Sequence, residues 1–456
     1  MQNQLNLKSL KLINYRCFDT LNIEFDENIT VLIGSNGGGK TGLLDAVAIA
    51  LGPFVGAFDF GVGKHFTRTD IRLAKVRETE SVEMEYADGG VILEAKGLIP
   101  GESSVPSQIW RRRLSSPKNS KTTIKEAKNL IEYGKALQSK VKDGNDAAIL
   151  PVIAYYGTGR LWHQRHLHDK RKKLGKSSRT IGYFECLDPA SSYKLFANWF
   201  EYWSKNAKNE KLKAFEKGAP LKETEFDRYI KSVAGAVDVC LQVAGWKGIK
   251  YSMAAEEIVV EHDAHGQLPV TLLSDGIRNM IGMVADIAFR ATKLNPQLGE
   301  NASLETPGVV LIDEVDMHLH PEWQQVVLRN LKEAFPRIQF IATTHSPQVL
   351  SSIKRSNIRV LSRNVQNEFI AEQPIEDTYG RDSGLVMHEA MEVDPSPPIG
   401  ERQALNRLSE LVDSGQYECK EANELFSELK SKLGKEHPHL LRLEKSKKRQ
   451  EALKAL

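Results

Sequence analysis

The sequence has few cysteines and no long apolar run, and both absences narrow the class of protein. Its 456 residues include four cysteines, Cys17, Cys186, Cys240 and Cys419, which lie far apart and form no C-x-x-C pair. A disulfide framework and a structural zinc site are therefore disfavoured, and reduced intracellular cysteines are expected. No run of about 18 apolar residues occurs, so no membrane span is expected. The first residues lack the pattern of a signal peptide, which favours a cytoplasmic protein.

An excess of charge of one sign is also absent. The formal net charge is +3, which by itself does not indicate a nucleic-acid-binding protein. Hydrophobic residues make up 41% of the chain and charged residues 27%, as in ordinary globular proteins with a sizeable core. The length predicts about three domain-sized pieces.

The strongest motif occupies residues 34–41, with the sequence Gly-Ser-Asn-Gly-Gly-Gly-Lys-Thr. It fits the phosphate-binding pattern G-x-x-x-x-G-K-[ST], in which glycines let the backbone aim its N–H groups at phosphate oxygens. Lys40 is expected to reach the β- and γ-phosphates of ATP, and the Thr41 hydroxyl to hold Mg²⁺. The residues expected to bind the nucleotide in this loop are Asn36, Gly37, Gly38, Gly39, Lys40 and Thr41.

The residues around this loop supply the context that the motif requires. The apolar, β-branched run 29–33 predicts a buried strand, and the apolar spacing over 43–51 predicts a helix that ends at Gly52-Pro53. A glycine-rich turn that binds nothing is the alternative, which the strand–loop–helix order disfavours.

Outside this loop, the residue patterns predict further strands and helices. Alternating residues predict strands at 5–18 and 21–25, and a hairpin whose strands, 81–86 and 91–95, flank Asp88-Gly89-Gly90. A polar helix is expected at 123–143, a strand at 150–156 and helices over 188–245. Within the cationic stretch 163–173, His163, His166 and His168 match no standard zinc spacing. A solvated basic loop is favoured there, with contact to a phosphate backbone as an open alternative.

Three further motifs follow the helical stretch. Ser274, in Leu-Ser-Asp-Gly, is a good N-cap for the helix that follows it. The apolar strand 309–312 ends in Asp313 and Glu314, where Asp313 would hold Mg²⁺ and Glu314 would polarise the attacking water. The strand 339–344 ends in His345. Glu314 and His345 are the candidate catalytic residues, and Thr41 and Asp313 the candidate metal ligands.

These motifs, together with Arg16 in Asn-Tyr-Arg-Cys-Phe, resemble the head domain of SMC, RecF and OLD-like ABC ATPases over roughly residues 5–100 and 250–365. The resemblance implies that Ser274 and Gly276 contact the γ-phosphate held by a second head, and that His345 senses this phosphate. It also implies that Arg16 lies near the nucleotide, although a solvated strand-end cation is an equal alternative. Asp275 replaces the usual glycine, and no glutamine between Gln4 and Gln108 can supply a glutamine loop.

The whole layout resembles the PtuA-like ATPases of Septu and retron anti-phage defence systems. The segments that carry this resemblance are 150–160, 273–276, the strand 309–314 with its two terminal carboxylates, 379–382 and the small helical tail. The family implies an ATPase that controls a separate HNH nuclease and assembles into a homo-oligomer of at least two copies, expected to be larger than a dimer. Contact to DNA or retron RNA/DNA is an open option. The sequence between Lys40 and Ser274 contains no sustained heptad repeat, so a coiled-coil arm of the SMC type is not expected. The alternatives are a stand-alone RecF-like DNA repair ATPase and a nucleotide-locked scaffold with little turnover.

The expected fold is therefore an α/β, ABC-type ATPase head with a mixed sheet, a helical insertion and a small helical C-terminal module. The N-terminal lobe of the head is expected over residues 1–100 and a mainly helical insertion over 101–248. The C-terminal lobe is expected over 249–375 and the helical module over 376–456.

Overall fold

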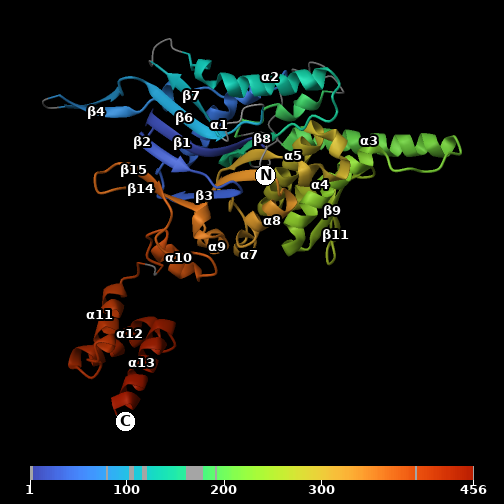
Figure 1. The fold of residues 1–456 in the computed structure, drawn as a ribbon. Coiled ribbons are helices and arrows are strands. Elements are labelled where there is room, and N and C mark those ends of the chain that lie inside the picture. The colour runs from blue at the N-terminus through green and yellow to red at the C-terminus, as the bar shows by residue number, and fades with distance from the viewer. Residues whose placement is uncertain are drawn as a thin grey trace. The chain divides into compact units, whose positions relative to one another are not determined.

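The chain divides into two compact units, residues 1–393 and 394–456, which we describe separately (Figure 1). The structure is a computed structural model, and it describes residues 4–78, 81–101, 107–115, 121–160, 178–189, 193–395 and 398–454. Within these parts of the chain, no helix combines the length and apolar character needed to cross a membrane.

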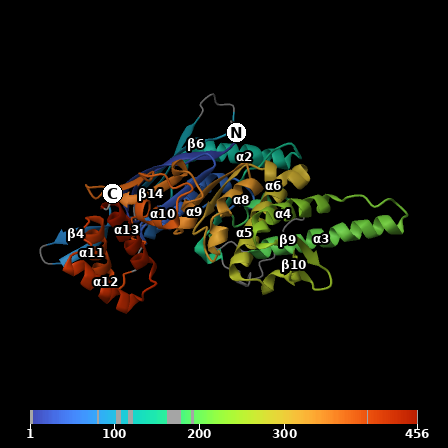
Figure 2. The same ribbon diagram turned by 90° about the horizontal axis from the view of Figure 1, so that it is seen from below.

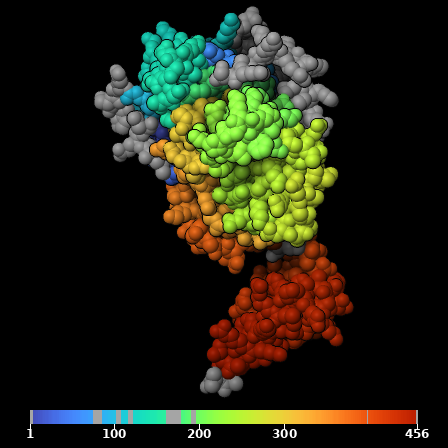
Figure 3. All heavy atoms as spheres, turned by 90° about the vertical axis from the view of Figure 1, so that its right-hand side faces the viewer, coloured from blue at the N-terminus to red at the C-terminus, as the bar shows by residue number. Residues whose placement is uncertain are grey.

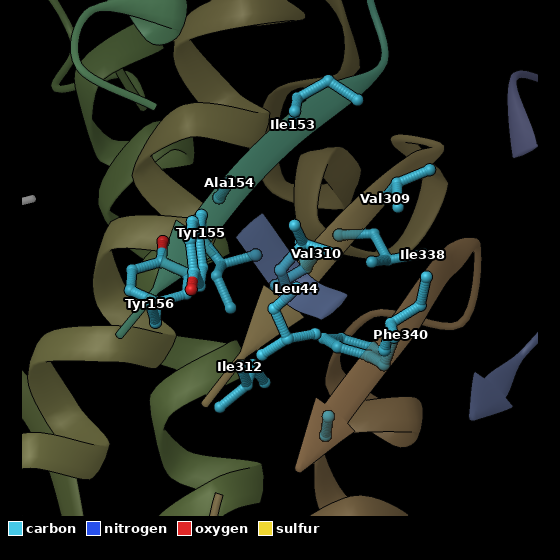
Figure 4. Close-up of a cluster of buried hydrophobic side chains, with 14 of the residues drawn as sticks. Leu44, Ile153, Ala154, Tyr155, Tyr156, Val309, Val310, Ile312, Ile338 and Phe340 are labelled. Atoms are coloured by element: carbon cyan, nitrogen blue, oxygen red, sulfur yellow. The ribbon is translucent and has the colours of Figure 1, made fainter. Parts of the chain in front are cut away.

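A six-stranded mixed sheet forms the centre of the first unit. Its strand order is β15-β14-β3-β13-β12-β8, with five parallel strands and β15 antiparallel at one edge. The strands are β3 (Ile29–Gly34), β8 (Val152–Tyr156), β12 (Gly308–Ile312), β13 (Ile338–Thr343), β14 (Ile358–Arg363) and β15 (Phe369–Glu372). Every residue of β8, β12 and β13 is buried, as expected for central parallel strands. Figure 4 shows Leu44 among the side chains of these strands.

This sheet confirms the α/β fold class and the predicted strand before the glycine-rich loop. Because parallel strands end at the same edge, β3, β12 and β13 deliver the loop, Asp313 and His345 to one place. β8 pairs in parallel with β12, so it belongs to the central sheet although it lies inside the range 101–248 expected as a helical insertion. Its position depends on pairing with a strand about 150 residues later, which local sequence does not specify.

A four-stranded antiparallel sheet has the order β2-β1-β6-β7. Its strands are β1 (Asn6–Tyr15), β2 (Phe18–Glu24), β6 (Val91–Leu98) and β7 (Gln108–Leu114). The predicted hairpin around Asp88-Gly89-Gly90 is wrong, because β5 (Ser81–Tyr86) pairs with β4 (Leu73–Glu78) and β6 pairs with β1 and β7. The alternating residues Val91, Leu93 and Ala95 are buried, and pairing with β1 and β7 completes their apolar face.

The helix after the loop, α1 (Lys40–Val55), continues past its predicted end at Gly52-Pro53. Pro53 has no N–H, so the carbonyl of Ile49 loses its helical partner. The fully buried guanidinium of Arg112, on β7, replaces it: Nη1 donates to the Ile49 oxygen at 2.8 Å. Burial lowers the pKa of Arg112 to about 10. The helix therefore continues because a distant arginine satisfies the carbonyl that the proline leaves free.

Helices cover the rest of the first unit. They are α2 (Lys128–Lys142), α3 (Tyr193–Glu216), α4 (Glu225–Leu241), α5 (Asp275–Leu294), α6 (Ala302–Glu305), α7 (Pro321–Gln324), α8 (Val327–Ala334), α9 (Pro347–Leu350) and α10 (Ser383–Glu389). A small antiparallel sheet, β9 (Trp246–Ser252), β10 (Glu257–His262) and β11 (Gly266–Pro269), precedes α5. Phe196, Phe200 and Trp203 of α3 are buried in the core, as their helical spacing predicts, while Trp199 is half-buried against it.

A buried ion pair fixes α5 to the central sheet. Arg290 Nε donates to Asp286 Oδ2 at 2.7 Å, and both side chains are almost fully buried. The hydroxyl of Tyr156, at the end of β8, donates to the same oxygen at 2.7 Å. The backbone N–H of Asp313 donates in turn to the Tyr156 carbonyl at 2.7 Å. This network links the helix that begins after Ser274 to the strand end that carries Asp313.

The second unit contains three helices, α11 (Arg402–Asp413), α12 (Lys420–Leu433) and α13 (Pro438–Lys454), which pack together (Figure 2). Its own small core includes Leu408, Tyr417, Leu429 and Leu440, and the space-filling view shows its atoms as one body (Figure 3). The helical module was expected from residue 376, whereas the compact unit begins at residue 394 and α10 belongs to the first unit.

Candidate nucleotide site

A cleft of about 360 Å³ lies where β3, β12 and β13 end. Its size suits a nucleotide-sized ligand. The residues that line it are Arg16, Cys17, Asn36, Gly37, Gly39, Lys40, Thr41, Gly42, Asp313, Glu314 and His345. The structure thus brings together residues from the β1–β2 turn, the glycine-rich loop and the ends of two parallel strands.

The glycine-rich loop has the conformation that its sequence predicts. Gly37 and Gly39 have φ values of 77° and 90°, in the left-handed region that favours glycine. A Cβ at Gly39 would lie 2.3 Å from the ring of Phe18, so this position also requires the smallest residue. Gly38 is outside the cleft lining, and its N–H donates to the Ser35 carbonyl at 3.0 Å.

Lys40 is buried and folds back onto the loop. Its Nζ donates to the carbonyl oxygens of Gly34 and Ser35 at 2.9 and 3.0 Å. Burial lowers the pKa of Lys40, and the nearby carboxylates of Asp313 and Glu314 oppose this shift. The ammonium group is therefore positioned by backbone oxygens at the edge of the cleft, where it can also meet phosphate oxygens.

The side-chain oxygens of Thr41 and Asp313 lie next to each other. Thr41 Oγ1 donates to Asp313 Oδ2 at 2.8 Å, and Asp313 is almost fully buried. Mg²⁺ prefers such oxygen ligands and usually takes one or two from protein, with phosphate and water completing the octahedron. The donor set at this position therefore fits Mg²⁺, with Thr41 and Asp313 as the residues that would hold it.

Thr343, the last residue of β13, positions both acidic residues, and the sequence analysis missed it. Its hydroxyl donates to Asp313 Oδ1 at 2.6 Å and accepts from the backbone N–H of Glu314 at 2.7 Å. Glu314 has a φ of 48°, an uncommon conformation for a side-chain-bearing residue. The hydroxyl therefore fixes a metal-ligating carboxylate and supports a strained backbone position at once. Its position at the end of β13, two residues before His345, was the one feature of the sequence that could have identified Thr343 as a site residue.

Replacing Thr343 by valine is expected to lower kcat by about 10- to 100-fold, the usual cost of losing a partner of a metal ligand. Valine keeps the shape of threonine, so the change removes the hydroxyl alone. We expect the KM for ATP to change little, because the phosphate-binding loop is untouched. Steady-state phosphate release at saturating Mg²⁺ measures both parameters.

Thr30→Val is the matched control, because Thr30 is equally buried but its hydroxyl accepts only from the Asp26 N–H in the described contacts. A similar loss of kcat in both variants would contradict the positioning role of Thr343. A second readout is Mn²⁺ binding to the nucleotide-loaded protein by electron paramagnetic resonance, which should weaken in Thr343→Val only.

Arg16 reaches the cleft with a fixed orientation. Its guanidinium contacts Asp45 Oδ2 and Asp70 Oδ1, each at 2.8 Å. Burial lowers the pKa of Arg16, but the nearby Tyr15, Asp45 and Asp70 outweigh that effect, so it remains charged. Asp70 is buried and also accepts from the Thr67 N–H at 2.8 Å. Sequence analysis missed both carboxylates, although the polar turn 67–70 contains a capping box.

Ser274 and Gly276 do not line this cleft. Both lie at the start of α5, where Ser274 is exposed and its side chain makes no capping hydrogen bond. A Cβ at Gly276 would lie 2.3 Å from the His318 carbonyl, so the glycine allows α5 to approach the segment after Glu314. Asp275 pairs with Arg278 on the same helix. The structure of one chain thus keeps these two residues apart from the nine candidate site residues that line the cleft.

His345 is exposed and lines the cleft, while the residues beside it tie the strand end to the segment after Asp313. Thr344 Oγ1 donates to Asp316 Oδ1 at 2.5 Å, and Ser346 Oγ donates to the Gln324 side chain at 2.7 Å. His163, His166 and His168 lie outside the described residues.

Comparison with known families supports an ATPase activity. The chain matches a family model described as an AAA domain over residues 9–232. It also matches one described as an AAA domain, putative AbiEii toxin, Type IV TA system, over residues 164–351. The predicted ATPase is confirmed by these matches and by relatives that are themselves described as probable ATPases.

The predicted resemblance to retron and Septu ATPases is also confirmed. The chain is 25% identical to the Retron Vc95 probable ATPase of Vibrio cholerae serotype O1 biovar El Tor, over 92% of this chain and 86% of that protein. It is 25% identical to the Retron Ec83 probable ATPase of Escherichia coli, over 96% of this chain and 86% of that protein. The Septu protein PtuA of Bacillus mycoides (strain KBAB4) is 32% identical over 28% of this chain and 19% of that protein.

Among solved structures, an SMC head bound to the C-terminal winged-helix domain of ScpA aligns with a TM-score of 0.46 and 14% identity. The alignment covers 80% of this chain and 98% of that chain.

Proposed function

We propose that this chain, an ATPase similar over most of its length to retron ATPases, is the regulatory subunit of an anti-phage defence complex. ATP would bind between two copies of the chain, and its hydrolysis would release them. The cycle would control a separate HNH-type nuclease that cuts DNA. The relatives named for retrons and for Septu support the defence role.

Each residue of the cleft has a distinct role in this proposal. Lys40 and the loop N–H groups bind the β- and γ-phosphates, and Arg16 adds a fixed positive charge. Mg²⁺, held by Thr41 and Asp313, would neutralise developing charge on the phosphates. Glu314 accepts a hydrogen bond from the attacking water and orients it toward the γ-phosphorus. His345, which lines the same cleft, would contact the γ-phosphate.

One observation carries the idea that two copies share each site. Ser274, whose hydroxyl makes no capping hydrogen bond at an exposed helix N-terminus, does not line the cleft of its own chain. A helix N-terminus attracts phosphate through its unpaired N–H groups and dipole. A second copy could bring this N-terminus to the γ-phosphate and so complete the site.

Mixing two inactive variants tests the shared site. Lys40→Ala disables the loop of its own chain, and Ser274→Arg disables the helix N-terminus that serves the other chain. A 1:1 mixture is expected to recover about a quarter of wild-type ATPase activity, since half of the two-fold dimers are mixed and each contains one intact site of two. Phosphate release after subunit exchange measures this.

The matched control mixes Lys40→Ala with Glu314→Gln. Both changes lie in the same cleft of a single chain, so neither site of a mixed dimer is intact and no activity should return. If the Lys40→Ala and Ser274→Arg mixture stays inactive while labelled subunits demonstrably exchange, the site belongs to one chain and the proposal is wrong.

A further inference from the structure

The last helix of the second unit is α13 (Figure 2). One face of this helix carries an exposed row of cations. Arg442, Lys445, Lys448 and Arg449 are all exposed. Lys445 lies three residues after Arg442, and Lys448 and Arg449 lie three and four residues after Lys445, which is helical spacing. Leu440 and Leu443, on the other side of the helix, belong to the core of the unit. We call these four cations the basic row.

In the part of the unit that the structure describes, no carboxylate lies close enough to pair with the basic row. The two glutamates of α13 are already engaged, because Glu444 pairs with Lys430 and Glu451 lies 3.9 Å from Lys447. In residues 398–454, the structure pairs none of the four cations with a carboxylate within 4.0 Å. The other two helices differ, since Arg407 pairs with Glu421 at 2.7 Å and Lys432 with Glu428 at 2.7 Å.

The helix dipole does not account for the basic row. Cations stabilise a helix only within about its last turn. Arg442 is the fifth residue of α13, near the positive end of the dipole, and Lys445 and Lys448 lie in the middle. Four neighbouring like charges also repel one another, so the row costs stability in the isolated chain unless an anionic partner offsets it.

We propose that the basic row binds the phosphate backbone of a nucleic acid. Arg442, Lys445 and Lys448 recur every three residues, or about 4.5 Å along the helix, Arg449 directly follows Lys448, and the row spans about 10 Å. One nucleic-acid strand carries a phosphate about every 3.4 Å, so the row matches about three phosphates. Contacts to phosphate oxygens carry no sequence information, so binding through the backbone alone would not depend on the base sequence.

A second copy of the chain fits the row less well. The acidic part of the unit, residues 398–428, carries seven Asp and Glu against three Lys and Arg. Much of that charge is neutralised within the unit, because Glu421, Glu424 and Glu428 each pair with a cation. A phosphate backbone, by contrast, offers a continuous line of unpaired negative charge.

Fluorescence anisotropy with the full chain tests the proposal. The probes are a labelled 30-nucleotide single strand and its duplex, without ATP, over a range of KCl concentrations. In the row variant, all four cations are changed to glutamine. The control variant changes Arg402, Arg407, Lys420 and Lys432 to glutamine, which removes equal charge from cations that are paired.

For the row variant, we expect affinity to fall at least about 10-fold at 100 mM KCl. The slope of log K against log salt should fall by about 3 for the duplex, because each neutralised phosphate contributes about 0.9 to this slope. The control variant should keep both values within about 2-fold of wild type. Unchanged affinity and slope in the row variant, or an equal loss in both variants, would overturn the proposal.

Two further readouts distinguish loss of nucleic-acid binding from unfolding and from self-association. The melting temperature of the row variant should equal or exceed that of wild type, because the substitutions remove only repulsion between cations. If the melting temperature falls and binding weakens, unfolding explains the weaker binding and the inference is overturned. Light scattering measures self-association: loss of oligomers with intact DNA binding would assign the row to a second copy. ATPase activity without nucleic acid should be unchanged, so this test can fail without affecting the proposed ATP cycle.

Discussion

Replacing Lys40 by alanine is expected to weaken ATP binding by at least about 30-fold, because truncating one member of a desolvated charge pair costs about 2–5 kcal/mol. The side chain is buried against two loop carbonyls, so no neighbouring cation can take its place in the cleft without rearranging the loop. Isothermal titration calorimetry with ATP and Mg²⁺ measures the change directly.

Lys332→Ala is the matched control for this experiment. Lys332 is half-buried, burial lowers its pKa to about 8, and its Nζ donates to the carbonyls of Pro336 and Ile338 at 2.8 and 3.0 Å. Both substitutions thus remove a lysine that binds two backbone oxygens, but only Lys40 lines the cleft. Retained ATP affinity in Lys40→Ala, or an equal loss in Lys332→Ala, would contradict the site assignment.

The phosphate-binding loop and its two flanking elements could be predicted because their information is local. The apolar run before Gly34 and the spacing after Thr41 decide strand and helix without distant contacts. The end of α1 could not be predicted in the same way. Pro53 normally ends a helix, and only Arg112, some 60 residues later, satisfies the carbonyl that it leaves free.

Other features could not be predicted because they depend on pairing between strands that are far apart in the sequence. The turn at Gly89 and Gly90 has the left-handed backbone of a hairpin, yet the strand that follows pairs with β1 near the N-terminus. A turn signal therefore identifies a change of direction but not the partner strand. Thr343 was missed for a related reason, since its role depends on the parallel pairing that places β13 beside the end of β12.

In the candidate site too, the sequence identified individual residues but not how they come together in space. Asp313, Glu314 and His345 could be found because each ends an apolar strand, which is visible in sequence. Their convergence on one cleft follows from parallel strand order, which the sequence motifs implied only through a family resemblance. Asp45 and Asp70, which orient Arg16, carry no such signal, because an acidic residue in a helix or turn is commonly just solvated.

Glu314→Gln is expected to lower kcat by about 10²- to 10⁴-fold while ATP binding is retained, as is typical when a group that orients or deprotonates water is lost. Glutamine has the same shape, and the backbone N–H of residue 314 keeps its hydrogen bond to Thr343. Removing a carboxylate near the γ-phosphate also removes repulsion, so ATP affinity should be equal or higher. Single-turnover phosphate release and calorimetry measure the two effects separately.

Glu322→Gln provides the control, because Glu322 is exposed on the nearby α7 and does not line the cleft. Its kcat should match that of wild type. Equal turnover in wild type and Glu314→Gln would instead favour a nucleotide-locked scaffold, in which the cleft holds ATP without using the carboxylate for hydrolysis.

The same pair of proteins separates a regulatory ATPase from the other functions. If the chain only controls a nuclease, purified wild-type protein and Glu314→Gln should both leave DNA intact without a partner. DNA cutting by wild type alone, lost in Glu314→Gln, would place the nuclease activity in this chain and contradict the proposal. Strong stimulation of wild-type hydrolysis by DNA, without any partner, would favour a stand-alone RecF-like ATPase. Glu314 is decisive in each case because its substitution stops turnover while the loop, the metal ligands and the fold remain in place.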